Sequence, residues 1–141
     1  GGFGAIHTGL LYNHTFGKII AFSSALIHRE VMGMTPGFAN EIANYEYYRQ
    51  IFGEPKDLPT SENNPEFLYQ KRKAANEPIA PIYMAIGTED FLYNANQDFL
   101  NFLKEEGADV TYTEGPGNHN WEFWGKNIEP ALCWALEIPQ P

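Results

Sequence analysis

The sequence is poor in three features, each of which would point to a particular class of protein. Its 141 residues include one cysteine, Cys133, so no disulfide can form within the chain. Lysine and arginine number 9 against 18 aspartates and glutamates, which leaves a net charge of −9. No apolar run approaches the ~20 residues of a membrane-spanning helix. We therefore expect neither a nucleic-acid partner nor a membrane partner, because so acidic a chain repels phosphate backbones and anionic lipids.

Apolar and aromatic residues, by contrast, are plentiful. Hydrophobic residues make up 43% of the chain and aromatic residues 15%, while charged residues account for 19%. This composition is typical of one folded domain with a substantial core. No secretory signal peptide is visible, so the expected location is cytoplasmic. The chain begins Gly-Gly-Phe-Gly-Ala without methionine or a preceding strand, which predicts that it opens inside a longer fold and leaves room for a leader peptide upstream.

Helical and strand-like patterns alternate along the chain. In the last expected helix, Asn120 is predicted to cap the first turn, and Pro130 is predicted to kink or restart the helix. Alternation of helices and strands predicts an α/β fold with three parallel strands, flanking helices and right-handed crossovers. The expected elements are a helix over 2–13, a strand over 18–23, a mostly helical segment over 28–77, a strand over 79–86, a helix over 94–106, a strand over 110–113 and a last helix to Leu136.

Residues 28–77 look like a helical insertion between the first two strands. The pattern predicts one helix over 38–51 and a second over 67–75, with Pro65 at the start of the second. Three tyrosines in the first helix could line a pocket, but packing of an amphipathic face is the favoured interpretation. The face of that helix would carry Ile42, Tyr45, Tyr48 and Ile51.

Two polar residues stand out because each follows a predicted strand. Asp90 comes just after the strand over 79–86, and His119 comes 29 residues later, behind a Gly-Pro-Gly turn at 115–117. Ligands of parallel sheets bind beyond the carboxyl ends of the strands, so both side chains are expected at one sheet edge. A carboxylate there can hold a histidine that acts as a general base. Glu89 competes with Asp90 for the role of the carboxylate.

Other kinds of site find weaker support in the sequence. A dinucleotide-binding glycine loop at the start of the chain would need a third glycine where His7 stands. A metal site built on His119 and Glu122 would lack further ligands nearby in the sequence. Ser23 and Ser24 end a strand without a glycine elbow, which disfavours either as a nucleophile. We therefore predict no cofactor and no metal.

The segments 87–92 (Gly-Thr-Glu-Asp-Phe-Leu) and 115–124 (Gly-Pro-Gly-Asn-His-Asn-Trp-Glu-Phe-Trp) resemble the esterase-D-like branch of the α/β-hydrolases. That branch includes tributyrin and acetyl esterases, feruloyl and acetylxylan esterases and S-formylglutathione hydrolases. The opening at 1–5 resembles the end of that family's nucleophile elbow, Gly-x-Ser-Met-Gly-Gly-[aromatic]-Gly-Ala. The resemblance implies that residues 1–141 form the C-terminal portion of a single α/β-hydrolase domain, with 28–77 as its helical insertion.

The resemblance also implies roles for individual residues. Asp90 matches the acid of a Ser-His-Asp triad and His119 matches its base. Ser24, Phe91 and Trp121 would lie at the substrate pocket. The nucleophilic serine would stand two residues before Gly1, outside this chain, so the chain alone would be inactive.

Two hypotheses of function follow. The first is a serine carboxylesterase that hydrolyses small acyl esters or thioesters without a cofactor. The second is a non-catalytic α/β fragment that associates through its open sheet edge, for example as a homo-oligomer, because an unpaired strand edge and uncovered apolar surface promote association.

Overall fold

A three-stranded parallel sheet forms the centre of the computed structural model, which describes all 141 residues. The strands lie in the order β1 (Ile19–Phe22), β2 (Ile82–Gly87) and β3 (Val110–Gly115). Every residue of β2 is buried, as expected for the middle strand. The last pair in the register between β2 and β3 is Gly87 opposite Gly115, so both strands end at the same edge. The predicted α/β fold with three parallel strands is confirmed.

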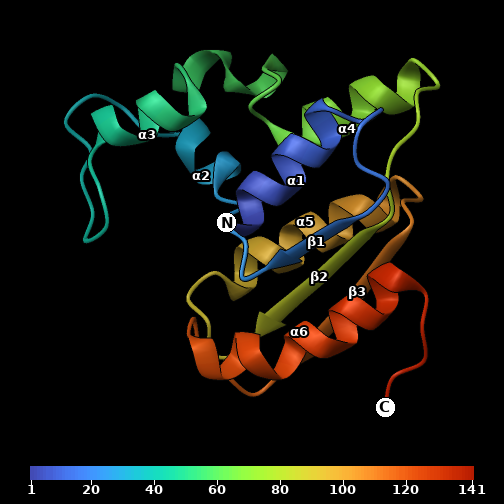
Figure 1. Cartoon of the computed structure of the whole chain (residues 1–141). Coiled ribbons are helices and arrows are strands. Elements are labelled where there is room, and N and C mark those ends of the chain that lie inside the picture. The colour runs from blue at the N-terminus through green and yellow to red at the C-terminus, as the bar shows by residue number, and fades with distance from the viewer.

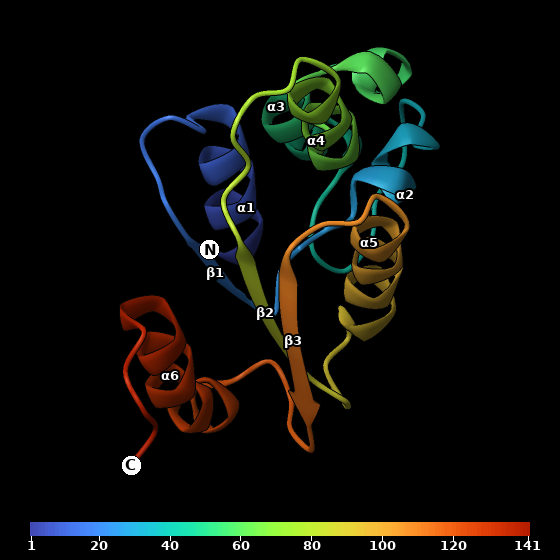
Figure 2. The ribbon, with the colours of Figure 1, turned by 90° about the vertical axis from the view of Figure 1, so that its right-hand side faces the viewer.

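Helices cover both faces of this sheet, and Figure 2 shows α5 and α6 on opposite sides of the strands. Alternate side chains of β2 point to opposite faces, as the strand period requires. Met84 belongs to the main core with α1 (Gly2–Leu11) and α5 (Tyr93–Glu105), whereas Tyr83 packs with α6 (Trp121–Leu136). None of the helices combines the length and apolarity that crossing a membrane requires.

Residues 28–77, called the insertion below, lie at one end of the molecule (Figure 1). They form α2 (His28–Met32), α3 (Tyr45–Phe52), the 3₁₀ helix η1 (Pro55–Thr60) and α4 (Pro65–Ala74). A small apolar cluster of its own holds the first three together. The last helix, α4, joins the main core through Leu68 and Tyr69. The insertion is therefore anchored to the rest of the domain through α4.

The predicted helix over 38–51 is wrong in its first half, because the structure begins α3 only at Tyr45. The Asn40 side chain accepts hydrogen bonds from the backbone N–H groups of Ile42 and Ala43, which folds this segment into a turn. The Asn44 side chain then caps the helix by accepting from the N–H of Tyr47. Hydrogen bonds from the backbone to short polar side chains thus replace helical hydrogen bonds in this segment. As a result Ile42 is 68% exposed and does not share a buried face with Tyr48.

The other helix boundaries show the value of local sequence signals. Pro65 is the first residue of α4 and Asn64 caps it, as Asn120 caps α6. Pro130 does not restart α6, which continues through it from Trp121 to Leu136. The outer edges of β1 and β3 have no strand neighbour within this chain. Association through such an edge stays a prediction.

Candidate active site

Asp90 and His119 meet at the carboxyl ends of β2 and β3. The Nδ1 atom of His119 lies 3.0 Å from Oδ2 of Asp90, whose side chain is fully buried while that of His119 is 37% exposed. The other carboxylate oxygen, Oδ1, accepts a hydrogen bond from the N–H of Leu92 at 2.9 Å. A carboxylate fixed in this way favours the histidine tautomer with its proton on Nδ1 and a free lone pair on Nε2. In this arrangement Nε2 of His119 is free to accept a proton.

Two glycines allow the turn after β2 and the loop after β3 to approach so closely. A Cβ added to Gly87 would lie 2.2 Å from the carbonyl oxygen of Gly117, so only glycine fits there. Gly117 itself has φ +152°, a conformation that residues with a side chain rarely adopt. The backbone N–H of Glu89 donates to the carbonyl of Gly117 at 3.0 Å. The loop that carries His119 is therefore bonded directly to the turn that carries Asp90.

Glu89 and Asp90 are neighbours with different partners. The sequence leaves open which of them faces the histidine, and the structure brings Asp90 to His119. The Glu89 side chain is exposed, and its Oε2 accepts from the N–H of Gly117 at 2.6 Å and from the Thr88 hydroxyl at 2.7 Å. These two hydrogen bonds lower the pKa of Glu89, the bond from Gly117 more strongly. Glu89 is therefore ionised at neutral pH.

Aromatic rings surround the imidazole of His119. The Trp124 ring meets it edge-on at 5.0 Å between centroids, and the Phe91 ring lies at 5.2 Å. Trp124 is itself fixed, because its indole N–H donates to the Ser23 hydroxyl at 3.0 Å. These contacts restrict the rotation of the imidazole, and they leave Nε2 without a hydrogen-bond partner.

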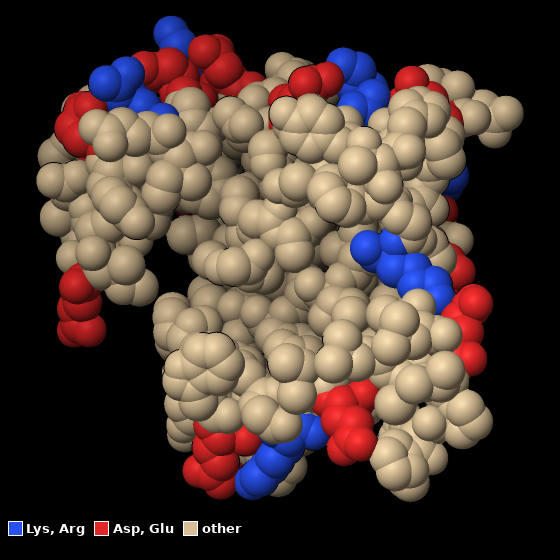
Figure 3. Space-filling view, viewed as in Figure 1, with Lys and Arg blue, Asp and Glu red and all other residues tan.

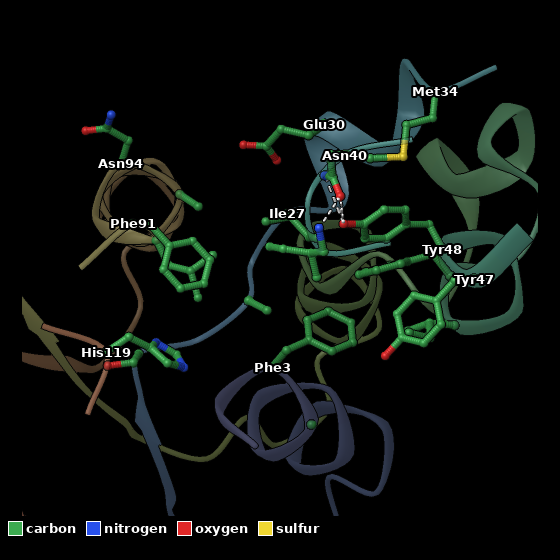
Figure 4. Close-up of a pocket in the computed structure, with 18 of the residues that line it drawn as sticks. Phe3, Ile27, Glu30, Met34, Asn40, Tyr47, Tyr48, Phe91, Asn94 and His119 are labelled. Carbon is green, nitrogen blue, oxygen red and sulfur yellow. Dashed lines mark hydrogen bonds between the residues drawn. The ribbon is translucent and has the colours of Figure 1, made fainter. Parts of the chain in front are cut away.

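His119 opens onto a cavity of about 950 Å³ between the sheet edge and the insertion. In Figure 4, His119 and Phe91 stand on one side of this space and Tyr47 and Tyr48 on the other, with Phe3 between them. Figure 3 shows a hollow where the insertion faces the start of α6, with the charged groups gathered mainly along the upper, lower and right-hand edges of this view. Most of the lining residues are apolar, and just over half of these apolar residues come from the insertion, including Met34, Phe38, Ile42, Ile51 and Phe52.

The predicted pocket residues differ in where the structure places them. Phe91 lines the cavity. Ser24 does not, since it is completely buried and its hydroxyl has no hydrogen-bond partner. Trp121 is 79% exposed and packs against Trp124, outside the cavity wall. The serine on the wall is instead Ser23, whose φ of +46° turns the chain directly after β1.

Some lining residues were missed or undervalued by sequence reasoning. Tyr48 packs in the core of the insertion, as the favoured interpretation expects, and also lines the cavity with Tyr47. The cluster of tyrosines was the signal that could have found both. Glu30 and Asn40, also on the wall, carry no signal in the sequence that separates them from other surface residues.

The structure gives no support to a metal site. No three side chains of His, Cys, Asp or Glu converge in the chain. Glu122, considered above as a partner of His119, forms an ion pair with Lys126 at 3.0 Å on the exposed side of α6.

Comparison with known proteins identifies relatives of the whole chain. The chain is 44% identical to an acetyl esterase of Caldicellulosiruptor saccharolyticus over 138 aligned residues. The alignment covers 98% of this chain and 52% of the relative. Two Staphylococcus aureus structures share 26% identity over 94% of this chain. They are an S-formylglutathione hydrolase (TM-score 0.76, 50% of its chain) and a substrate-bound, fluorophosphonate-binding serine hydrolase (TM-score 0.77, 49% of its chain).

A ferulic acid esterase shares the fold at a TM-score of 0.66 and 21% identity, over 99% of this chain and 49% of its own. The chain thus spans about half the length of the relatives it matches. The family model described as "Putative esterase" matches residues 1–135. Given this match and the oriented histidine at the sheet edge, the chain belongs to that esterase family and has its α/β-hydrolase fold.

Proposed function

We propose that the complete protein hydrolyses small acyl esters or thioesters through a Ser-His-Asp triad. His119 is the general base of this triad and Asp90 its acid. The observation that carries the proposal is the 3.0 Å contact between His119 and the buried carboxylate of Asp90, at the wall of a large apolar cavity. The acetyl esterase relative supports the ester class, and the S-formylglutathione hydrolase relative supports the thioester class.

In the proposed mechanism each group has its own step. Nε2 of His119 takes the proton of the serine hydroxyl as the serine oxygen attacks the acyl carbon. Asp90 stabilises the imidazolium that forms. His119 then gives this proton to the leaving alcohol or thiol, and an acyl-serine remains. In the second half, His119 takes a proton from water, the hydroxide attacks the acyl carbon, and the serine leaves with the proton restored.

We assign the nucleophile to a serine upstream of residue 1. The chain holds three serines, and none suits the role. The Ser23 hydroxyl accepts from Trp124, Ser24 is buried without access, and Ser61 caps a turn through the N–H of Asn63. Support for an upstream position comes from Gly1, which lines the same cavity as His119 and directly precedes the first residue of α1. The free N–H groups of a helix start suit the developing charge of an acyl-transfer reaction.

The test uses the complete protein, p-nitrophenyl acetate as substrate and a fluorophosphonate as a serine-directed label. We expect turnover by the wild type and a loss of roughly 10³-fold or more in kcat for His119→Gln, because the serine then has no base. His14→Gln, a change to an exposed histidine, is the matched control and should keep full activity.

Peptide mapping of the fluorophosphonate adduct locates the nucleophile. We expect the label on a serine that precedes Gly1. A label on Ser23 or Ser24 would contradict the upstream assignment, and near-normal kcat in His119→Gln would overturn the triad itself.

A further inference from the structure

Glu89 connects two segments of the site although it is exposed to solvent. Its carboxylate accepts a hydrogen bond from the N–H of Gly117 at 2.6 Å, and its own N–H donates to the carbonyl of Gly117 at 3.0 Å. One residue therefore satisfies both backbone polar groups of Gly117. The Thr88 hydroxyl donates to the same carboxylate oxygen at 2.7 Å and holds the side chain in place.

The loop that receives these bonds leads directly to the histidine. Gly117 precedes His119 by two residues, and its φ of +152° gives this loop an unusual path. Besides the contact of Asp90 with the His119 ring, three hydrogen bonds join the backbone of the loop to the turn after β2. They run from the N–H of Thr88 to the carbonyl of Gly115, from the N–H of Glu89 to Gly117, and from the N–H of Gly117 to the Glu89 carboxylate. The last is the only one that involves a side chain, so a substitution can remove it alone.

The turn thus holds the histidine loop at two points. Asp90 contacts the imidazole ring, and the neighbouring Glu89 contacts the backbone two residues before it. We propose that Glu89 is a positioning residue, whose carboxylate fixes the backbone at Gly117 and thereby keeps His119 aligned between Asp90 and the substrate cavity. This role rests on the proposed function of His119 as the general base.

Loss of the hydrogen bond between Glu89 and Gly117 should affect turnover more than the stability of the fold. A hydrogen bond from N–H to a carboxylate is short and strong, and it fixes direction. Misplacement of a catalytic group by about 1 Å can cost roughly 10²-fold in rate. A bond at the exposed surface, however, contributes little to global stability. Removal of the Glu89 carboxylate should therefore reduce kcat and leave the fold nearly unchanged.

The experiment compares Glu89→Ala and Glu89→Gln in the complete protein. Alanine removes the acceptor, whereas the glutamine carbonyl can still accept from the N–H of Gly117. We expect kcat to fall about tenfold in Glu89→Ala with KM within about twofold, and to return close to the wild-type value in Glu89→Gln. Glu105→Ala, a change to an exposed glutamate on α5, removes the same charge and should leave kcat unchanged.

The pH profile of kcat/KM separates positioning from simple electrostatics. If Glu89 acted through its charge on the imidazole, both variants would lose the charge, and both would shift the midpoint of the profile to lower pH by the same amount. Positioning predicts an unchanged midpoint and rescue by glutamine. Equal losses in the two variants, a shared shift of the midpoint, or full kcat in Glu89→Ala would each overturn the proposal.

His119→Gln, assayed in parallel, distinguishes failure of this inference from failure of the proposed function. If His119→Gln is inactive and Glu89→Ala is fully active, the triad stands and the positioning role falls. If His119→Gln retains activity, the proposed function falls and the role of Glu89 falls with it.

Discussion

The two sides of the cavity are built in different ways. On one side, the turn after β2 and the loop after β3 extend from strands packed in the main core, where Met84 and Ile86 are completely buried. On the other side, the insertion has a cluster of only four buried apolar residues. Polar contacts of its asparagines, and an ion pair between α2 and α4, complete its structure.

This difference suggests that the two sides of the cavity have different roles. The sheet edge supplies both members of the proposed catalytic pair and holds them through backbone contacts at Gly87 and Gly117. The insertion supplies just over half of the apolar residues of the cavity wall, but none of the hydrogen-bond or aromatic partners of His119. Changes at the sheet edge should therefore alter turnover, whereas changes within the insertion should alter stability or substrate fit.

The largest effect is expected for Asp90→Asn. Asparagine would keep the size of the side chain but would stabilise the wrong tautomer of His119 and could not balance the imidazolium. We expect kcat to fall by roughly 10⁴-fold, as for the same change in a well-studied protease triad. Measurement of p-nitrophenyl acetate turnover by the complete protein checks this. Asp98→Asn, at an exposed position on α5, is the control, and comparable kcat in the two variants would break the assignment of Asp90.

A smaller loss of activity is expected for Gly87→Ala. The added methyl group would lie 2.2 Å from the carbonyl oxygen of Gly117, and the three nearest atoms all belong to the backbone of Gly117 and Asn118, so the histidine loop must move. We expect a loss of roughly 10²-fold in kcat, in line with a displacement of about 1 Å. The control is Gly115→Ala, at the position paired with Gly87 across the strands, where nothing lies within 4 Å of an added Cβ.

The outcome of this pair of variants bears on how the site is held. A large loss in Gly87→Ala and none in Gly115→Ala would sharpen the contrast between the close-packed sheet edge and the looser insertion. Equal, small effects would show that the loop tolerates displacement and would weaken the argument that its backbone is fixed.

Sequence reasoning located the sheet and the paired residues because their signals are local and periodic. Short apolar runs marked the first two strands, the segment Val-Thr-Tyr-Thr at 110–113 marked the third, and a polar residue after each of two strands marked Asp90 and His119. Topology then required both to lie at one edge. The family resemblance favoured Asp90 over Glu89, but the residues alone left the choice open, because it depends on side-chain direction within a tight turn.

The insertion and the pocket were harder to predict for physical reasons. At Asn40 a single side chain accepts two backbone N–H groups and replaces part of an expected helix with a turn. At Ser23 and Ser24 a positive φ turns the chain, so that the first serine faces the cavity and the second is buried. The hydrogen bond from Gly117 to Glu89 joins residues 28 apart and leaves no periodic trace in the sequence.

The smallest effect on turnover is expected at Glu66, which joins α4 to α2 within the insertion. Its carboxylate lies 2.5 Å from Nε2 of His28 and receives two hydrogen bonds from Arg29, at 2.7 and 2.9 Å. Burial acts to raise the pKa of Glu66, but the hydrogen bonds and charges of His28 and Arg29 outweigh it and lower that pKa to about 2. Glu66→Gln should leave kcat at neutral pH within about twofold of the wild type, because none of these groups contacts His119.

The same contacts should make the stability of the insertion depend on pH. A carboxylate whose pKa is lower in the folded than in the unfolded state stabilises the fold fully above its ordinary pKa, near 4.5, and loses this contribution as the pH falls through about 2. Because a tenfold change in proton affinity corresponds to about 1.4 kcal/mol, the contribution lost is at most about 3 kcal/mol, and solvent screening of this partly exposed carboxylate reduces it. Urea unfolding of the complete protein between pH 6 and 2 should therefore show a steeper loss of stability for the wild type than for Glu66→Gln.

Glu62→Gln, which removes an exposed partner of Lys71, is the control and should follow the wild type, since exposed ion pairs contribute little. If the unfolding free energies of the wild type and Glu66→Gln fell in parallel with pH, the polar contacts of Glu66 would not stabilise the insertion. The insertion would then not differ from the sheet edge in depending on such contacts.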